Sequence, residues 1–88
     1  MGRYDTSALD TAALGAATTD ADMIFQLGMM YSTGASVEAD YVSAHKWFNL
    51  AAMNGNRDAA RLRREIAEMM TEVEIACAQR AARAWIGR

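Results

Sequence analysis

The fold of this chain is decided by residues 23–59, MIFQLGMMYSTGASVEADYVSAHKWFNLAAMNGNRDA. Apolar residues in its first part recur at the spacing of one helical face: Met23, Leu27, Met30 and Tyr31. Gly28 interrupts this stripe, and glycine costs a helix about 1 kcal/mol relative to alanine. Its presence is explained if another backbone or a large ring comes close. We therefore expect a helix over residues 21–32 with a close contact at Gly28.

A second helix follows after a short loop. Gly34 can adopt the left-handed conformation that ends many helices, and Asp40 is a good N-cap. Small and aromatic residues then recur at helical spacing: Tyr41, Ala44, Trp47, Phe48, Ala51 and Ala52. The Asn-Gly-Asn sequence at residues 54–56 ends this helix. The pattern predicts a helical hairpin whose second helix spans residues 40–54.

Helical periodicity continues beyond the hairpin. It predicts helices over residues 57–69 and 72–86, and the second has a capping-box sequence starting at Thr71. No alternating run indicates a strand, and the sequence has no proline. Residues 1–20 form an N-terminal extension rich in Ala, Thr, Ser and Asp, for which disorder and a degenerate helix near 8–17 both stay open. We expect an all-α protein with one helical domain over residues 21–88.

The order and spacing of residues in the hairpin resemble the Sel-one-like repeat, a relative of the tetratricopeptide repeat. The resemblance spans residues 23–59 of the 88 and is carried by Leu27, Gly28, Tyr31, Gly34, Val37, Asp40, Ala44, Trp47, Ala51, Ala52, Gly55 and Ala59. It implies an α-α superhelix, a short solenoid with one full hairpin and two C-terminal helices. The family loop usually has a second glycine where this chain has Ser36, so the loop conformation is left open.

The resemblance also implies a function, because such repeats usually bind other proteins and rarely carry chemistry. We predict a noncatalytic adaptor, scaffold or accessory subunit, without cofactor or metal, that binds another protein. About three stacked units are normally needed to cover a solenoid core, so a structural homo-oligomer is the alternative. Apolar residues beyond what the hairpin needs are the candidate contact residues: Ile24, Phe25, Met29, Trp85 and Ile86.

A small-ligand or penicillin-binding protein is a weaker alternative. Ser43 and Lys46 have the Ser-x-x-Lys spacing of serine β-lactamases, but the other motifs of those enzymes are missing. Two exposed polar positions on a helix whose core residue is Ala44 explain the pair far better. We expect His45 on the exposed side of the same helix and Cys77 as a small buried hydrophobe. We also expect methionines to fill an irregular core: Met29, Met30, Met53, Met69 and Met70.

Charge is divided along the chain. Residues 1–56 carry two basic and six acidic side chains (net −4), and residues 57–88 carry seven and five (net +2), which gives −2 overall. Since the arginines alternate with acids and the isoelectric point is about 5.2, we do not expect nucleic-acid binding. No apolar run reaches the length of a signal peptide or membrane span. We expect a soluble protein, cytoplasmic by default.

Overall fold

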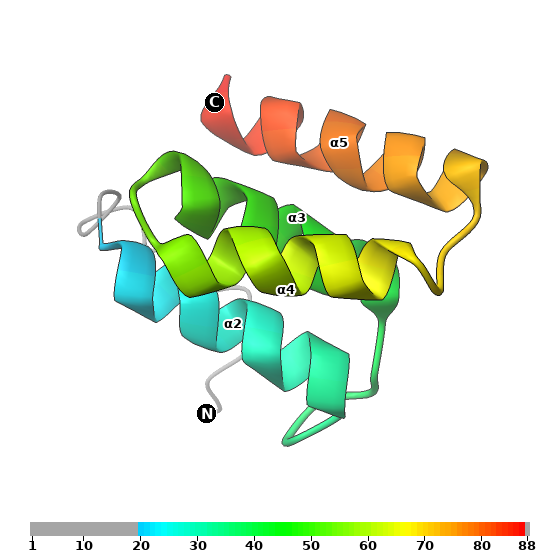
Figure 1. The fold of residues 1–88 in the computed structure, drawn as a ribbon, viewed down its shortest axis with the longest axis horizontal. Helices are drawn as coiled ribbons and strands as arrows, with labels where there is room; N and C mark the ends of the chain where they lie inside the picture. Colours follow the sequence, from blue (N-terminus) through cyan, green and yellow to red (C-terminus); the bar gives the residue numbers. More distant parts are fainter. Residues whose placement is uncertain (1–19, 88) are drawn as a thin grey trace, which may run out of the picture.

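The computed structural model describes residues 20–87. Within this range there are four helices and no strand: α2 (Ala21–Thr33), α3 (Tyr41–Met53), α4 (Arg57–Ala67) and α5 (Glu72–Ile86). Successive helices alternate in direction, and α2 and α3 form the predicted hairpin (Figure 1). The prediction of an all-α superhelix is confirmed. The predicted helix near residues 8–17 lies outside the described residues.

Local capping sets where the first two helices begin and end. The Asp20 carboxylate accepts hydrogen bonds from the backbone N–H groups of Asp22 and Met23, both at 3.1 Å, at the start of α2. Gly34, with a φ of 79°, ends the helix in the left-handed conformation. Asp40 caps α3 in the same way as Asp20 caps α2. These side chains satisfy backbone groups that a helix end leaves unpaired.

The last two helices also start at side-chain caps. Asn56 Oδ1 accepts a hydrogen bond from the backbone N–H of Ala59 at 2.8 Å, and Thr71 forms the predicted capping box with Glu74.

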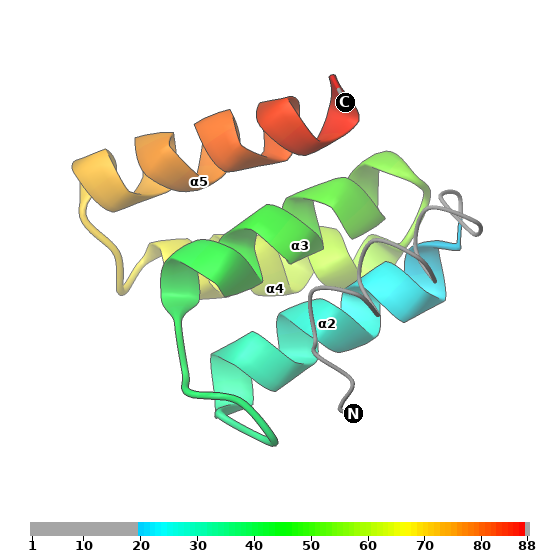
Figure 2. The same cartoon turned by 180° about the vertical axis from the view of Figure 1, so that it is seen from behind.

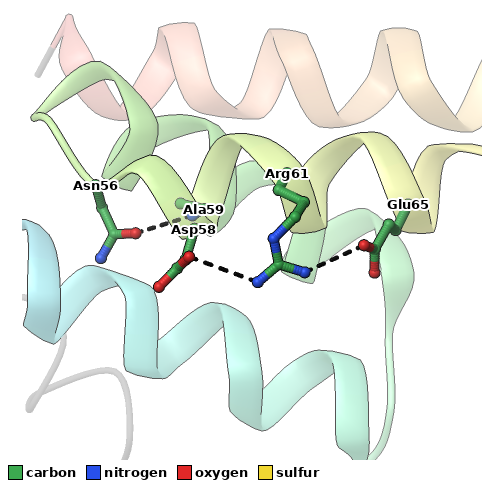
Figure 3. Close-up of polar contacts among 5 residues, drawn as sticks. All are labelled: Asn56, Asp58, Ala59, Arg61 and Glu65. Atoms are coloured by element: carbon green, nitrogen blue, oxygen red, sulfur yellow. Dashed lines mark hydrogen bonds and ion pairs between the residues drawn. The ribbon is translucent and has the colours of Figure 1, made fainter.

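On the exposed side of α4 a network of two ion pairs links Asp58, Arg61 and Glu65, at 3.5 and 3.2 Å (Figure 3). Because these charges are exposed, the network contributes little to stability. α4 ends two residues before its predicted end at residue 69.

The central helix of the fold is α3. α2, α4 and α5 each pack on it, and α2 and α5 lie on opposite sides of the layer made by α3 and α4 (Figures 1 and 2). The buried apolar residues form one cluster: Ile24, Leu27, Ala44, Trp47, Phe48, Leu50, Ala51, Ala59, Ile66 and Ala82. Half of the residues in this cluster belong to α3, because α3 is the helix that the three others cover.

A close contact between Gly28 and Phe48 joins α2 to α3. A Cβ atom at Gly28 would lie 2.5 Å from both Cδ1 and Cε1 of Phe48. The Phe48 ring is buried and packs against Phe25, with the two ring centroids 5.6 Å apart. The large ring expected beside Gly28 is therefore the ring of Phe48.

The α2–α3 loop keeps a glycine-like conformation at Ser36. Its φ of 72° lies in the left-handed region, where a residue with a side chain pays about 1–2 kcal/mol. The loop is closed by a hydrogen bond from the Asp40 N–H to the Tyr31 carbonyl at 2.9 Å, and Thr33 Oγ1 accepts the Ala35 N–H. The serine thus adopts a conformation that glycine would adopt without strain.

The rotation of α2 differs from the prediction. Met23 is exposed, whereas Ile24 is only 1% exposed and belongs to the core. α2 carries apolar residues on most of its sides, so periodicity alone does not show which side faces the core. The contact of Gly28 with Phe48 determines that side.

The methionine prediction is also partly wrong. Met53 and Met69 are 62% and 61% exposed, because they lie at the end of α3 and just after α4. Three other methionines are partly buried against the core: Met29, Met30 and Met70.

Candidate interaction surface

The five predicted contact residues do not form one exposed surface. Ile24 is buried, so its prediction is wrong. Phe25, Met29 and Trp85 are half-buried and pack against the core. Of the five, only Ile86 is classed as exposed.

Trp85 attaches α5 to the central helix. Its ring meets that of Trp47 edge to face, with centroids 5.1 Å apart. The Lys46 ammonium lies 4.1 Å from the Trp47 ring centroid and 5.4 Å from that of Trp85. At these distances the cation is attracted to both ring faces. This arrangement explains why Trp85 offers only part of its surface to a partner.

Both side chains of the Ser-x-x-Lys pair make contacts that stabilise the fold. Ser43 Oγ donates a hydrogen bond to Asp40 Oδ2 at 2.9 Å, within the N-cap of α3. Lys46 lies over the tryptophan rings, and both side chains are half-buried rather than exposed as predicted. The hydroxyl therefore has a carboxylate partner, and the ammonium group has aromatic ones.

His45 is buried, contrary to its predicted exposure. It is 3% exposed, and its Nδ1 is buried without a hydrogen-bond partner. Burial lowers the pKa of His45 below its usual value of 6.5, and the nearby Arg63 guanidinium on α4 lowers it further. Arg63 itself donates a hydrogen bond to Asn49 Oδ1 at 2.6 Å. The prediction failed because α4 covers this side of α3.

The lowered pKa of His45 makes the stability of the fold depend on pH. As pH falls below 6.5 the unfolded chain takes up a proton at His45, while the folded chain resists it. The free energy of unfolding therefore decreases as the pH is lowered, by up to about 1.4 kcal/mol per pH unit, until the pH is below the pKa of His45 in the folded chain. The full contribution of neutral His45 is present above pH 6.5.

Cys77 is exposed, so the prediction of a buried thiol is wrong. α5 packs on α3 through one side, which carries Ala78, Ala82 and Trp85, and Cys77 lies away from that side.

Within residues 20–87, no cluster of three or more His, Cys, Asp or Glu side chains could hold a metal ion. Among the described helices, none combines the length and apolar composition that a membrane span requires.

Two exposed residues, Tyr41 and Met69, come together where α4 turns into α5, and the exposed Val73 follows in the first turn of α5. The Tyr41 hydroxyl lies 3.8 Å from the Met69 sulfur, although the two residues are 28 positions apart. Val73, in the first turn of α5, follows Met69 by four residues and is 76% exposed. We call Tyr41, Met69 and Val73 the turn patch. The start of α3, the end of α4 and the start of α5, to which these residues belong or lie next in sequence, are at the same end of the molecule (Figure 1).

Sequence reasoning missed this patch because Tyr41 and Met69 fit the helical periodicity of core residues. Their position at helix ends was the available signal. Tyr41 is the first residue of α3, and Met69 lies in the turn after α4. Side chains at such ends extend past the neighbouring helices that would cover them.

Comparison with known proteins finds a similarity for the hairpin. Residues 21–56 match the family model described as the Sel1 repeat. The match begins with α2 and ends at Asn56, the N-cap of α4, so it covers the α2–α3 hairpin. No curated protein and no solved structure matches the chain.

Proposed function

We propose, from the match of residues 21–56 to the Sel1 repeat, that the chain is a noncatalytic adaptor, scaffold or accessory subunit that binds another protein at the turn patch. Sel1 repeats generally mediate protein–protein interaction, and the family is generally non-catalytic. The observation that carries the proposal is the contact between the exposed residues Tyr41 and Met69. Aromatic residues and methionine are enriched in protein interfaces.

The charges around the turn patch indicate what kind of partner fits. Each patch residue has an acidic neighbour in the sequence. These acids are all exposed: Asp40, Glu68, Glu72 and Glu74. A partner that places an apolar side chain on the patch and lysine or arginine around it would match both features. Rim charges of this kind mainly accelerate association and make it sensitive to salt.

Two methionines allow a matched test. Met69 lies in the turn patch and Met53 lies outside it, and their exposures are nearly equal at 61% and 62%. We expect a partner captured from lysate by the tagged chain to be lost with Met69→Asp and retained with Met53→Asp. Helicity should be unchanged in both variants, as measured by circular dichroism. Capture that is equal for the two variants would exclude the turn patch as the binding site.

A further inference from the structure

The outward side of α5 carries a line of residues that no described helix covers. Val73, Cys77, Arg80 and Ala84 follow at the i, i+4, i+7 and i+11 spacing of one helical face, and all are exposed. In both views α5 lies at one edge of the molecule, opposite α2, and its extensive packing is with α3 (Figures 1 and 2). We call these four residues the α5 outer face.

The composition of the α5 outer face suits a second helix. Cys77 and Ala84 are small enough to let another backbone approach, and Val73 is the most exposed of the large apolar residues described.

The charges of α5 select a second copy of the same helix, in antiparallel orientation. Exposed acids, Glu72 and Glu74, lie in the first turn, whereas exposed arginines, Arg80 and Arg83, lie in the second half. A parallel copy would bring like charges together. An antiparallel copy brings the acidic end of each helix to the basic end of the other, which favours association and fixes orientation.

We propose that two copies of this chain associate through their α5 outer faces, antiparallel about a two-fold axis that passes between residues 78 and 79. In this register Val73 meets Ala84 of the other copy, and Cys77 meets Arg80. The register uses the same surface on both copies, as a two-fold interface requires. Glu72 and Arg83 are about three turns apart and lie on one flank, so each meets its opposite charge across the axis. This association goes beyond partner binding at the turn patch and shares only Val73 with it.

Sedimentation equilibrium over a range of protein concentrations tests the surface. The full chain should show a monomer–dimer equilibrium. Ala84→Glu, which faces Glu72 and Glu74 of the other copy, should raise the dimer Kd at least tenfold. Gln26→Glu, an exposed change on α2, should leave it unaltered. A chain that stays monomeric throughout, or a dimer equally stable in both variants, would overturn the proposal.

A charge exchange tests the register. Glu72→Arg and Arg83→Glu should each weaken the dimer, because each change sets like charges against one another across the axis. The variant that carries both changes should recover most of the lost affinity. Circular dichroism checks that every variant stays helical. If the double variant is weaker than either single one, the antiparallel register is wrong. Because Tyr41 and Met69 are unchanged throughout, failure here is distinguishable from loss of the turn patch.

Discussion

Replacing Gly28 by alanine should destabilise the protein, although alanine is the better helix former. In an exposed helix this change would stabilise by about 1 kcal/mol. At Gly28 the new methyl group would lie 2.5 Å from two carbon atoms of the Phe48 ring. Ordinary carbon–carbon contacts are about 3.5–4.0 Å, so the ring or the helix must move by roughly 1 Å.

The surroundings of Phe48 make that movement costly. The ring is 1% exposed and is backed by Phe25, so it has no free space to enter. Overpacking of a closed core typically costs about 1–3 kcal/mol, and two simultaneous overlaps place this site near the upper value. After subtracting the gain in helix propensity, we expect a net loss of about 2 kcal/mol in the free energy of unfolding.

Urea denaturation followed by circular dichroism measures this loss, and a double-mutant cycle assigns it to the ring. In a Phe48→Leu background the smaller side chain leaves room, so Gly28→Ala should be nearly neutral or stabilising. A coupling of about 2 kcal/mol between the two sites is expected. If Gly28→Ala instead stabilises the wild-type chain by about 1 kcal/mol, the close contact does not constrain the helix and the reasoning is refuted.

Two further predictions concern the loop and the buried histidine. Ser36→Gly should raise the free energy of unfolding by about 1 kcal/mol, because glycine adopts the φ of 72° without strain. Ala35→Gly, next to it but without a positive φ, should give no gain, and equal gains would contradict the prediction. Between pH 7.5 and 5.5 the wild type should lose stability, because its His45 has a lowered pKa. His45→Gln should lose less over the same range, and identical pH profiles would exclude this role for His45.

Helix ends were predictable from sequence because their causes are local. Asp40 and Thr71 bind backbone groups within three residues of themselves, and Gly34 needs only its own backbone freedom. Such short-range interactions are fully contained in a sequence window. The predicted helix starts therefore agree with the structure within one residue.

Burial was predicted less well, because it depends on which helices cover a given side. His45 was expected to be exposed, since a lone histidine beside a lysine gives no sign that α4 lies over it. Cys77 was expected to be buried, yet α5 packs through its opposite side. For α2, a rotation by one residue exchanges Met23 with Ile24, and only the partner helix decides between them.

The candidate site was missed for a related reason. Tyr41 and Met69 are 28 residues apart, and their contact forms only when α3 and α4 are packed together. Val73 lies off the apolar stripe of α5 that carries Ala78, Ala82 and Trp85, but this position alone does not connect it to a site. Sequence reasoning could therefore propose a binding module but could not find the contact between Tyr41 and Met69.

The central position of α3 has a consequence for synthesis on the ribosome. The chain emerges in the order α2, α3, α4, α5, so α3 can pair first with α2 alone. The sides of α3 that carry His45 and Trp47 then stay in contact with water until Arg63 and Trp85 have been made. During that interval the nascent hairpin presents apolar surface of the kind that chaperones recognise. Translation pauses between residues 54 and 85 would prolong this exposure and favour misassembly between neighbouring chains.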